Sequence, residues 1–217
     1  MDQTLHQALC TVECASCGAF GGYLYLLTCT RVCILCFTDI TENHSYRPLP
    51  SRHLLRHFAQ ARPLLNTLPQ VLSRPGKYSA DHINCHERVD LVDGQSAWEA
   101  SVALHGPVAA MHQRAIEDTW AQWTAESSTI SPARRPQSPD TSFDYGEGDP
   151  LRFMAVVRAP WLDQSSQSVE WGGYCRACYH MYQGSPPFWR MFTVASFDAH
   201  LRQHGAVKLG EDGIYCH

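Results

Sequence analysis

Four cysteines stand in two Cys-x-x-Cys pairs, Cys14 with Cys17 and Cys33 with Cys36, and 15 residues separate the pairs. Two intervening residues let both sulfurs of a pair converge from one turn, and two such turns can present four thiolates to one tetrahedral metal ion. Gly18 follows the second sulfur and permits a sharp turn of the backbone. The spacing therefore predicts a zinc site formed by these four cysteines.

Other interpretations of these cysteines remain open. Cys33 and Cys36 could be buried apolar thiols, or the four cysteines could form two disulfides. Cys10 and Cys29 could each replace one of the four, although neither belongs to a Cys-x-x-Cys pair. We interpret Cys29 as a buried thiol and leave Cys10 unassigned.

A third Cys-x-x-Cys pair, Cys175 with Cys178, is followed by His200 and His204. We expect both histidines on one helix that begins near residues 193–196, because a four-residue spacing puts them on one face. Gly205 is a good signal for the end of that helix. The order Cys-x2-Cys-x21-His-x3-His is an expanded zinc-finger pattern, since the usual central spacing is about 12 residues. We predict a second zinc site from these two cysteines and two histidines.

The second site also has alternatives. Three residues could serve as ligands if the fourth one is misassigned: His180, Cys216 and His217. Exposed histidines beside an inert cysteine pair would give the same pattern without any metal. If both sites form, each is closed by four protein ligands, whereas a catalytic zinc keeps a position open for water. The pattern therefore favours structural zinc, which would also stabilise small cores.

Several elements are needed to position these ligands. The segment from 20 to 27 has glycines near its start and is otherwise rich in aromatic and branched residues, which predicts a β-hairpin between the first two cysteine pairs. Helical spacing predicts a helix from Ser51 to about Ala61 and further helix over 94–126, interrupted at Gly106. The apolar run 152–158 predicts a buried strand. The fold class is therefore α+β, with a small zinc-stabilised hairpin lobe and helices, then a C-terminal zinc-finger-like lobe.

We expect two lobes joined by a linker. Residues 127–150 are rich in serine, proline and acidic residues. Such a segment buries too little apolar surface to offset the entropy lost on ordering, so it predicts a flexible linker. The expected domains are residues 1–126, with the four-cysteine site, and residues 151–217, with the second site.

Composition limits the class of protein. The chain has 217 residues with 44% hydrophobic content, which is typical of a folded protein. The sequence shows no secretory signal and no run long enough to span a membrane, so we expect no membrane partner. Ten cysteines without a signal peptide favour a reducing compartment and metal binding. The expected location is intracellular, cytoplasmic or nuclear.

The distribution of charge argues against general nucleic-acid binding. The net charge of −4 divides into +3 for residues 1–80, −8 for 81–150 and +1 for 151–217. Binding to phosphates needs a clustered cationic face, which no lobe supplies. The sequence also has no Gly-rich phosphate loop and no serine elbow, and its cysteines stand in metal-like pairs. We therefore expect a protein that is not an enzyme.

The segment from Cys14 to Phe37 resembles the region just after the F-box in a group of filamentous-fungal F-box proteins. The similarity continues in four further stretches: 68–78, 104–106, 152–161 and 171–204. In that group the F-box binds the Skp adaptor of a cullin ubiquitin ligase. Only thirteen residues precede Cys14, too few for a roughly 40-residue helical module. We therefore expect the chain as given to be either a shortened relative without the F-box or a gene model that lacks its start, and we do not assign adaptor binding to it.

Together these features predict a non-catalytic, zinc-stabilised protein-interaction module. By the resemblance, it would correspond to the substrate-side part of a fungal F-box protein, an adaptor of a ubiquitin ligase, with a protein partner. The alternative is a zinc-finger nucleic-acid-binding protein that uses the helix after Phe192. The near-neutral C-terminal lobe favours the first hypothesis.

Overall fold

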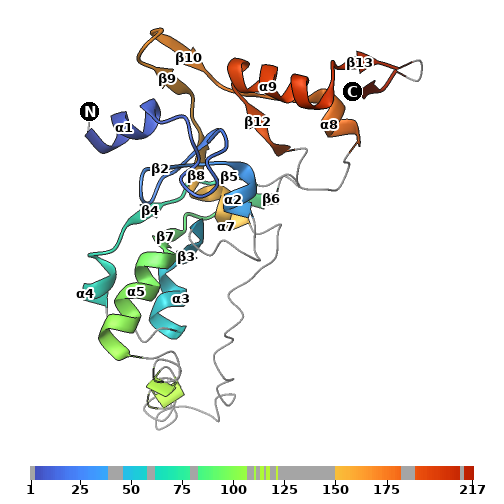
Figure 1. The fold of residues 1–217 in the computed structure, drawn as a ribbon. Coiled ribbons are helices and arrows are strands. Elements are labelled where there is room, and N and C mark those ends of the chain that lie inside the picture. The colour runs from blue at the N-terminus through green and yellow to red at the C-terminus, as the bar shows by residue number, and fades with distance from the viewer. Residues whose placement is uncertain are drawn as a thin grey trace. The chain divides into compact units, whose positions relative to one another are not determined.

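The chain forms two compact units in a computed structural model (Figure 1). The first unit contains Met1–Asp39 and Val156–His217, and the second contains Ile40–Ala155. The structure describes residues 3–38, 46–57, 62–78, 83–106, 150–181, 189–210 and 213–217, with isolated positions between 110 and 121. Helices alternate with small antiparallel sheets in both units, which confirms the predicted α+β class.

The first unit is built from short elements of both ends of the chain. From its N-terminal part come α1 (Gln3–Cys10), β1 (Tyr23–Tyr25), β2 (Thr30–Val32) and α2 (Ile34–Thr38). From its C-terminal part come β8 (Val156–Arg158), β9 (Trp161–Asp163), β10 (Ser168–Glu170), β11 (Gly173–Tyr174), α8 (Arg176–Met181), β12 (Met191–Phe192), α9 (Val194–His204), β13 (Lys208–Leu209) and β14 (Tyr215–Cys216).

A three-stranded antiparallel sheet joins these two parts in the order β2-β1-β8. Tyr23 lies opposite Val32 in one ladder and opposite Arg158 in the other. The β1–β2 pair confirms the predicted hairpin. The side chains of Tyr25 in β1 and Val32 in β2 are fully buried.

The observed units differ from the predicted lobes. Because β8 pairs with β1, residues 1–39 belong with the C-terminal part of the chain rather than with residues 40–126. The predicted boundary at residue 126 follows a change in composition, and composition carries no information on long-range strand pairing. Residues 127–149 of the predicted linker lie outside the described residues, and Pro150 begins a helix.

The second unit contains the remaining elements. They are β3 (Pro48–Pro50), α3 (Ser51–His57), α4 (Arg62–Leu65), β4 (Gln70–Leu72), β5 (Gly76–Tyr78), β6 (Ile83–Cys85), β7 (Asp90–Asp93), α5 (Gly94–His105) and α7 (Pro150–Met154). Strand β7 lies between β3 and β4 in an antiparallel sheet. A core formed by Leu49, Leu54, Leu65, Val92 and Ala97 packs α3, α4 and α5 against this sheet.

Three predicted elements can be compared directly. Helix α3 starts at Ser51 as expected, and residues 58–61 of its predicted extent are outside the described part of the chain. Helix α5 ends before Gly106, whose φ of 79° ends the helical backbone where an interruption was predicted. The strand predicted over 152–158 is wrong in its first half, because α7 occupies residues up to Met154 and only 156–158 form a strand. Proline at the first helical position favours this helix start.

Candidate metal centres

The first candidate centre is the group of Cys14, Cys17, Cys33 and Cys36. Their sulfur atoms all lie within 4.8 Å of one another, and Cys17 Sγ is 3.6 Å from Cys33 Sγ. Four thiolates around zinc, with Zn–S lengths of about 2.3 Å, stand about 3.8 Å apart in a tetrahedron. All four thiols are free, so the alternative of two disulfides does not describe this structure. The residues present fit a metal ion.

Two turns carry these sulfurs. In the first turn, Cys14 donates its N–H to the carbonyl of Ala19, and Gly18 donates its own to the carbonyl of Cys14. Gly18 has a φ of 71°, a left-handed conformation that glycine adopts without strain. In the second turn, which leads from β2 into α2, the backbone N–H of Cys36 donates to Cys33 Sγ at 3.4 Å. Such N–H donors stabilise negative charge on sulfur.

The protonation of these thiols would couple to metal binding. A hydrogen bond with Cys33 lowers the pKa of Cys14 to about 4. That hydrogen bond and burial raise the pKa of Cys33, and burial raises the pKa of Cys36 to about 12. A metal ion that binds all four sulfurs must therefore displace the protons that Cys33 and Cys36 hold.

The second candidate centre brings together Cys175, Cys178, His200 and His217, again with all donor atoms within 4.8 Å of one another. His217 Nε2 lies 3.3 Å from Cys175 Sγ and 3.5 Å from Cys178 Sγ, and His200 Nε2 lies 3.5 Å from Cys178 Sγ. A tetrahedral zinc with Zn–S of about 2.3 Å and Zn–N of about 2.0 Å would place S and N about 3.5 Å apart. This group also fits a metal ion.

The predicted second site needs one correction, because the structure places His217 in the group and leaves His204 out of it. The ring centroid of His204 lies 4.6 Å from that of His200 and 5.6 Å from that of His217. The helical spacing correctly put His200 and His204 on one face of α9. His217, which follows β14 (Tyr215–Cys216), nevertheless takes the fourth place in the group beside the two sulfurs. Cys216, another alternative, is exposed, and its Sγ donates to the carbonyl of Lys208 at 3.8 Å. Nothing is described for the His180 side chain.

Local structure explains how the second group is held. Cys175, only 1% exposed, precedes α8, and Cys178 lies within that helix. His200 lies on α9, which begins after Thr193 with a capping box and ends at Gly205, as the sequence predicted. Burial, reinforced by the neighbouring His204 and His217, lowers the pKa of His200. A neutral imidazole is the form that binds metal.

A buried arginine that could not be singled out from the sequence holds together backbone segments next to the first centre. Arg31 is 2% exposed, and its guanidinium donates to main-chain carbonyls from three separate segments. These acceptors are Ala8 at 2.9 Å, Leu9 at 3.4 Å, Gly21, Ala159 at 3.3 Å and Pro160 at 2.6 Å. Burial lowers the pKa of Arg31, and the carbonyls at the end of α1 offset the cost with the negative end of the helix dipole. No motif in the sequence distinguishes it from a surface arginine.

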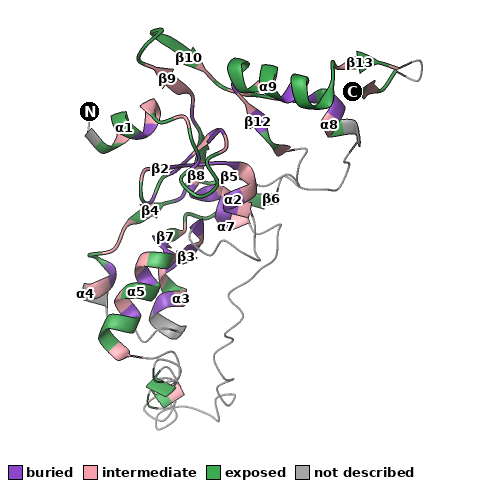
Figure 2. Ribbon diagram, viewed as in Figure 1, coloured by how far each residue is buried: buried purple, intermediate pink, exposed green. Residues whose placement is uncertain are grey.

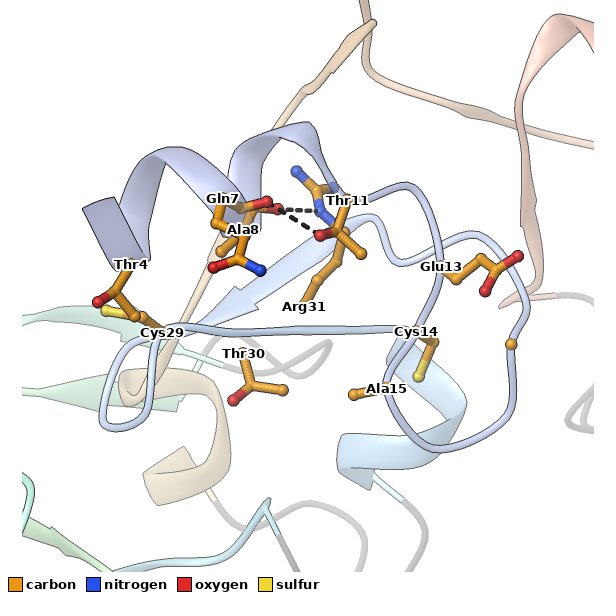
Figure 3. A pocket seen from close by; sticks show the side chains of 11 residues that line it. Thr4, Gln7, Ala8, Thr11, Glu13, Cys14, Ala15, Cys29, Thr30 and Arg31 are labelled. Atoms are coloured by element: carbon orange, nitrogen blue, oxygen red, sulfur yellow. Dashed lines mark hydrogen bonds between the residues drawn. The ribbon is translucent and has the colours of Figure 1, made fainter. Parts of the chain in front are cut away.

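A pocket of about 470 Å³ adjoins the first centre (Figure 3). It is lined by α1, by the loop that carries Cys14 and by the start of β2. Figure 3 shows Cys29 beside Thr4 at one end and Cys14 at the other. Cys29 is half-buried and has a φ of 52°, so it belongs to a tight turn rather than to the core in which we expected it.

Comparisons with known proteins leave these centres as the main guide to function. No protein-family model, curated protein or solved structure matches the chain. Among the described residues, no helix is both long enough and apolar enough to cross a membrane.

Proposed function

We propose that the chain is a non-catalytic protein-interaction module whose first unit is held together by two structural metal ions, with zinc as the natural ion for these ligands. The observation that carries the proposal is that each candidate centre offers four protein donor atoms within 4.8 Å of one another, which four-coordinate zinc requires. A site closed in this way leaves no position for substrate or activated water. The metals would act by fastening short elements that bury little apolar surface.

The surface of the first unit supports a role in binding. Helix α9 and strand β10 are largely exposed in Figure 2. The exposed apolar side chains of this unit include Trp171 at 51%, Val169 at 57% and Val194 at 73%. Glu170 Oε2 accepts a hydrogen bond from the Val194 N–H at 3.1 Å, so Trp171 and Val194 belong to one region of the surface. Tryptophan is enriched at the energetic centres of protein interfaces.

More specifically, we propose that this surface binds a protein destined for ubiquitination. The support for this is the resemblance to the region after the F-box of fungal F-box proteins. A nucleic-acid-binding role is the alternative. Its support is the exposed face of α9, where Arg202 is available, but Asp198 lies on the same helix and the charge of this part of the chain is close to neutral.

Metal content tests the structural half of the proposal. We expect two zinc ions per purified chain by elemental mass analysis, and one in each of the variants Cys14→Ser and Cys175→Ser. Cys85→Ser is a matched control, because Cys85 belongs to the second unit and to neither group. Metal-free wild-type protein with its fold intact would contradict the proposal.

Affinity purification with quantitative mass spectrometry tests the binding half. A protein retained by the wild type and lost with both Trp171→Ala and the metal-stripped chain would support the module. Retention of DNA or RNA that falls steeply with salt, in place of a protein, would favour the alternative.

A further inference from the structure

The β13–β14 hairpin has little apolar surface to hold it in place. Its strands contain two residues each, and a two-stranded hairpin of this size is marginal by itself. Leu209 is 62% exposed and Ile214 is 46% exposed. Among the described residues, the hairpin contacts α8 through a polar pair: Arg176 Nη1 donates to Tyr215 Oη at 3.0 Å and its guanidinium lies 5.2 Å from the ring centroid. A further interaction beside this one would fix the hairpin more firmly.

His217, which directly follows β14, supplies that interaction through both of its ring nitrogens. Nδ1 lies 2.9 Å from the carbonyl of Gly205. A carbonyl can only accept a hydrogen bond, so Nδ1 carries the proton. In the neutral ring Nε2 then has the free lone pair, and Nε2 is the atom that faces Cys175 and Cys178. A hydrogen bond from the other nitrogen is the usual device that orients a metal-ligating histidine.

The orientation of that carbonyl is in turn set by the end of α9. Gly205 caps the helix with a φ of 94°, and its N–H donates to the carbonyl of Leu201 at 2.8 Å. The helix that carries His200 therefore also orients the ring of His217, through the carbonyl of Gly205. His204, on the same helix, is exposed and outside the group of four.

We propose that a metal ion bound through Cys175, Cys178, His200 and His217 fastens the β13–β14 hairpin to α8 and α9, with His204 taking no part in ligation. The proposal rests on the second centre of the proposed function and adds what that metal controls. When the metal leaves, the hairpin detaches and uncovers the face of α8 that β14 contacts. Metal availability would thereby decide which surface this unit presents.

The test compares His217→Ala with His204→Ala in the full-length chain. Cobalt(II), which reports tetrahedral thiolate sites by visible absorption, measures binding, and hydrogen exchange of residues 206–217 measures attachment of the hairpin. We expect His204→Ala to behave as the wild type. His217→Ala removes a residue that binds the metal directly. It should therefore weaken cobalt binding at this centre by more than the roughly 10–100-fold typical of losing a residue that only hydrogen-bonds to a ligand. His217→Ala should also abolish the zinc-dependent protection of residues 206–217.

Peptides from α1 and β1 in the same samples report whether the rest of the unit remains folded. If His204→Ala weakens binding and His217→Ala does not, the ligand set is the one that the helical spacing suggested and the proposal is wrong. Equal exchange of residues 206–217 with and without bound zinc would overturn the hairpin proposal while leaving the two structural metals in place. Failure of the wild type to bind metal at either centre would overturn both.

Discussion

Replacement of Arg31 by methionine tests whether this buried guanidinium joins the two ends of the chain. Methionine has a similar length but cannot donate hydrogen bonds. The substitution therefore removes the Arg31 donors from three carbonyls that accept close hydrogen bonds in the native protein: Ala8 at 2.9 Å, Gly21, and Pro160 at 2.6 Å. A buried polar group without a partner costs about 1–3 kcal/mol. Because such costs do not add fully, we expect a loss of about 3–6 kcal/mol.

A loss of this size is a large share of the 5–15 kcal/mol that typically stabilises a folded domain. With a denaturant slope of about 2 kcal/mol per molar, the urea midpoint of the zinc-saturated protein should fall by about 1.5–3 M. The matched control is Arg158→Met in the same unit. Arg158 is exposed, and its hydrogen bonds to the carbonyls of Trp171 and Gly172 are long, at 3.4 and 3.3 Å. Its loss should cost about 0.5 kcal/mol. Equal midpoints for the two variants would refute our account of Arg31.

Two further substitutions probe local geometry in the same unit. Gly172→Ala should strongly destabilise the folded protein, because a Cβ there would lie 2.3 Å from Phe20 Cε1 and the backbone φ is 66°. The control is Gly173→Ala, which has open space around it. It should leave the urea midpoint nearly unchanged. Thr193→Ala removes the side chain that accepts from the Ser196 N–H at 3.1 Å, and should cost about 1 kcal/mol and speed hydrogen exchange at the start of α9. Exchange rates unchanged by Thr193→Ala would show that the cap does not stabilise the helix.

The ligands that could be predicted from the sequence are those whose spacing is local. Cys14 with Cys17, and Cys175 with Cys178, each depend on a single turn, and a turn is a property of neighbouring residues. His217 could only be named as an alternative, because its approach to Cys178 depends on how a hairpin folds back onto two helices. A helical spacing favoured His204 instead, since sequence periodicity reports the face of a helix but not what lies opposite it.

The helices and strands show the same difference between features set by neighbouring residues and features set by distant ones. Helix α9 was predicted to begin near residues 193–196 and to stop at Gly205, and it spans Val194–His204, because the end of a helix depends on neighbouring residues such as this glycine. The pairing of β1 with β8 could not be predicted, since three-residue strands carry almost no register information. Arg31 was missed for a related reason: its acceptors are carbonyl groups, which every residue has. The metal itself, and the partner of the exposed surface, stay predictions.

The pairing of β1 with β8 also determines when the first unit can form during synthesis. Tyr25 lies opposite Val156, so the central strand of the sheet leaves the ribosome about 130 residues before its second neighbour. At roughly 5–20 residues per second this interval lasts about 7–26 s. During it Arg31 has no access to the carbonyls of Ala159 and Pro160. Zinc capture by the four cysteines on either side of β1 and β2 would give the nascent segment an early fixed structure before the C-terminal part arrives.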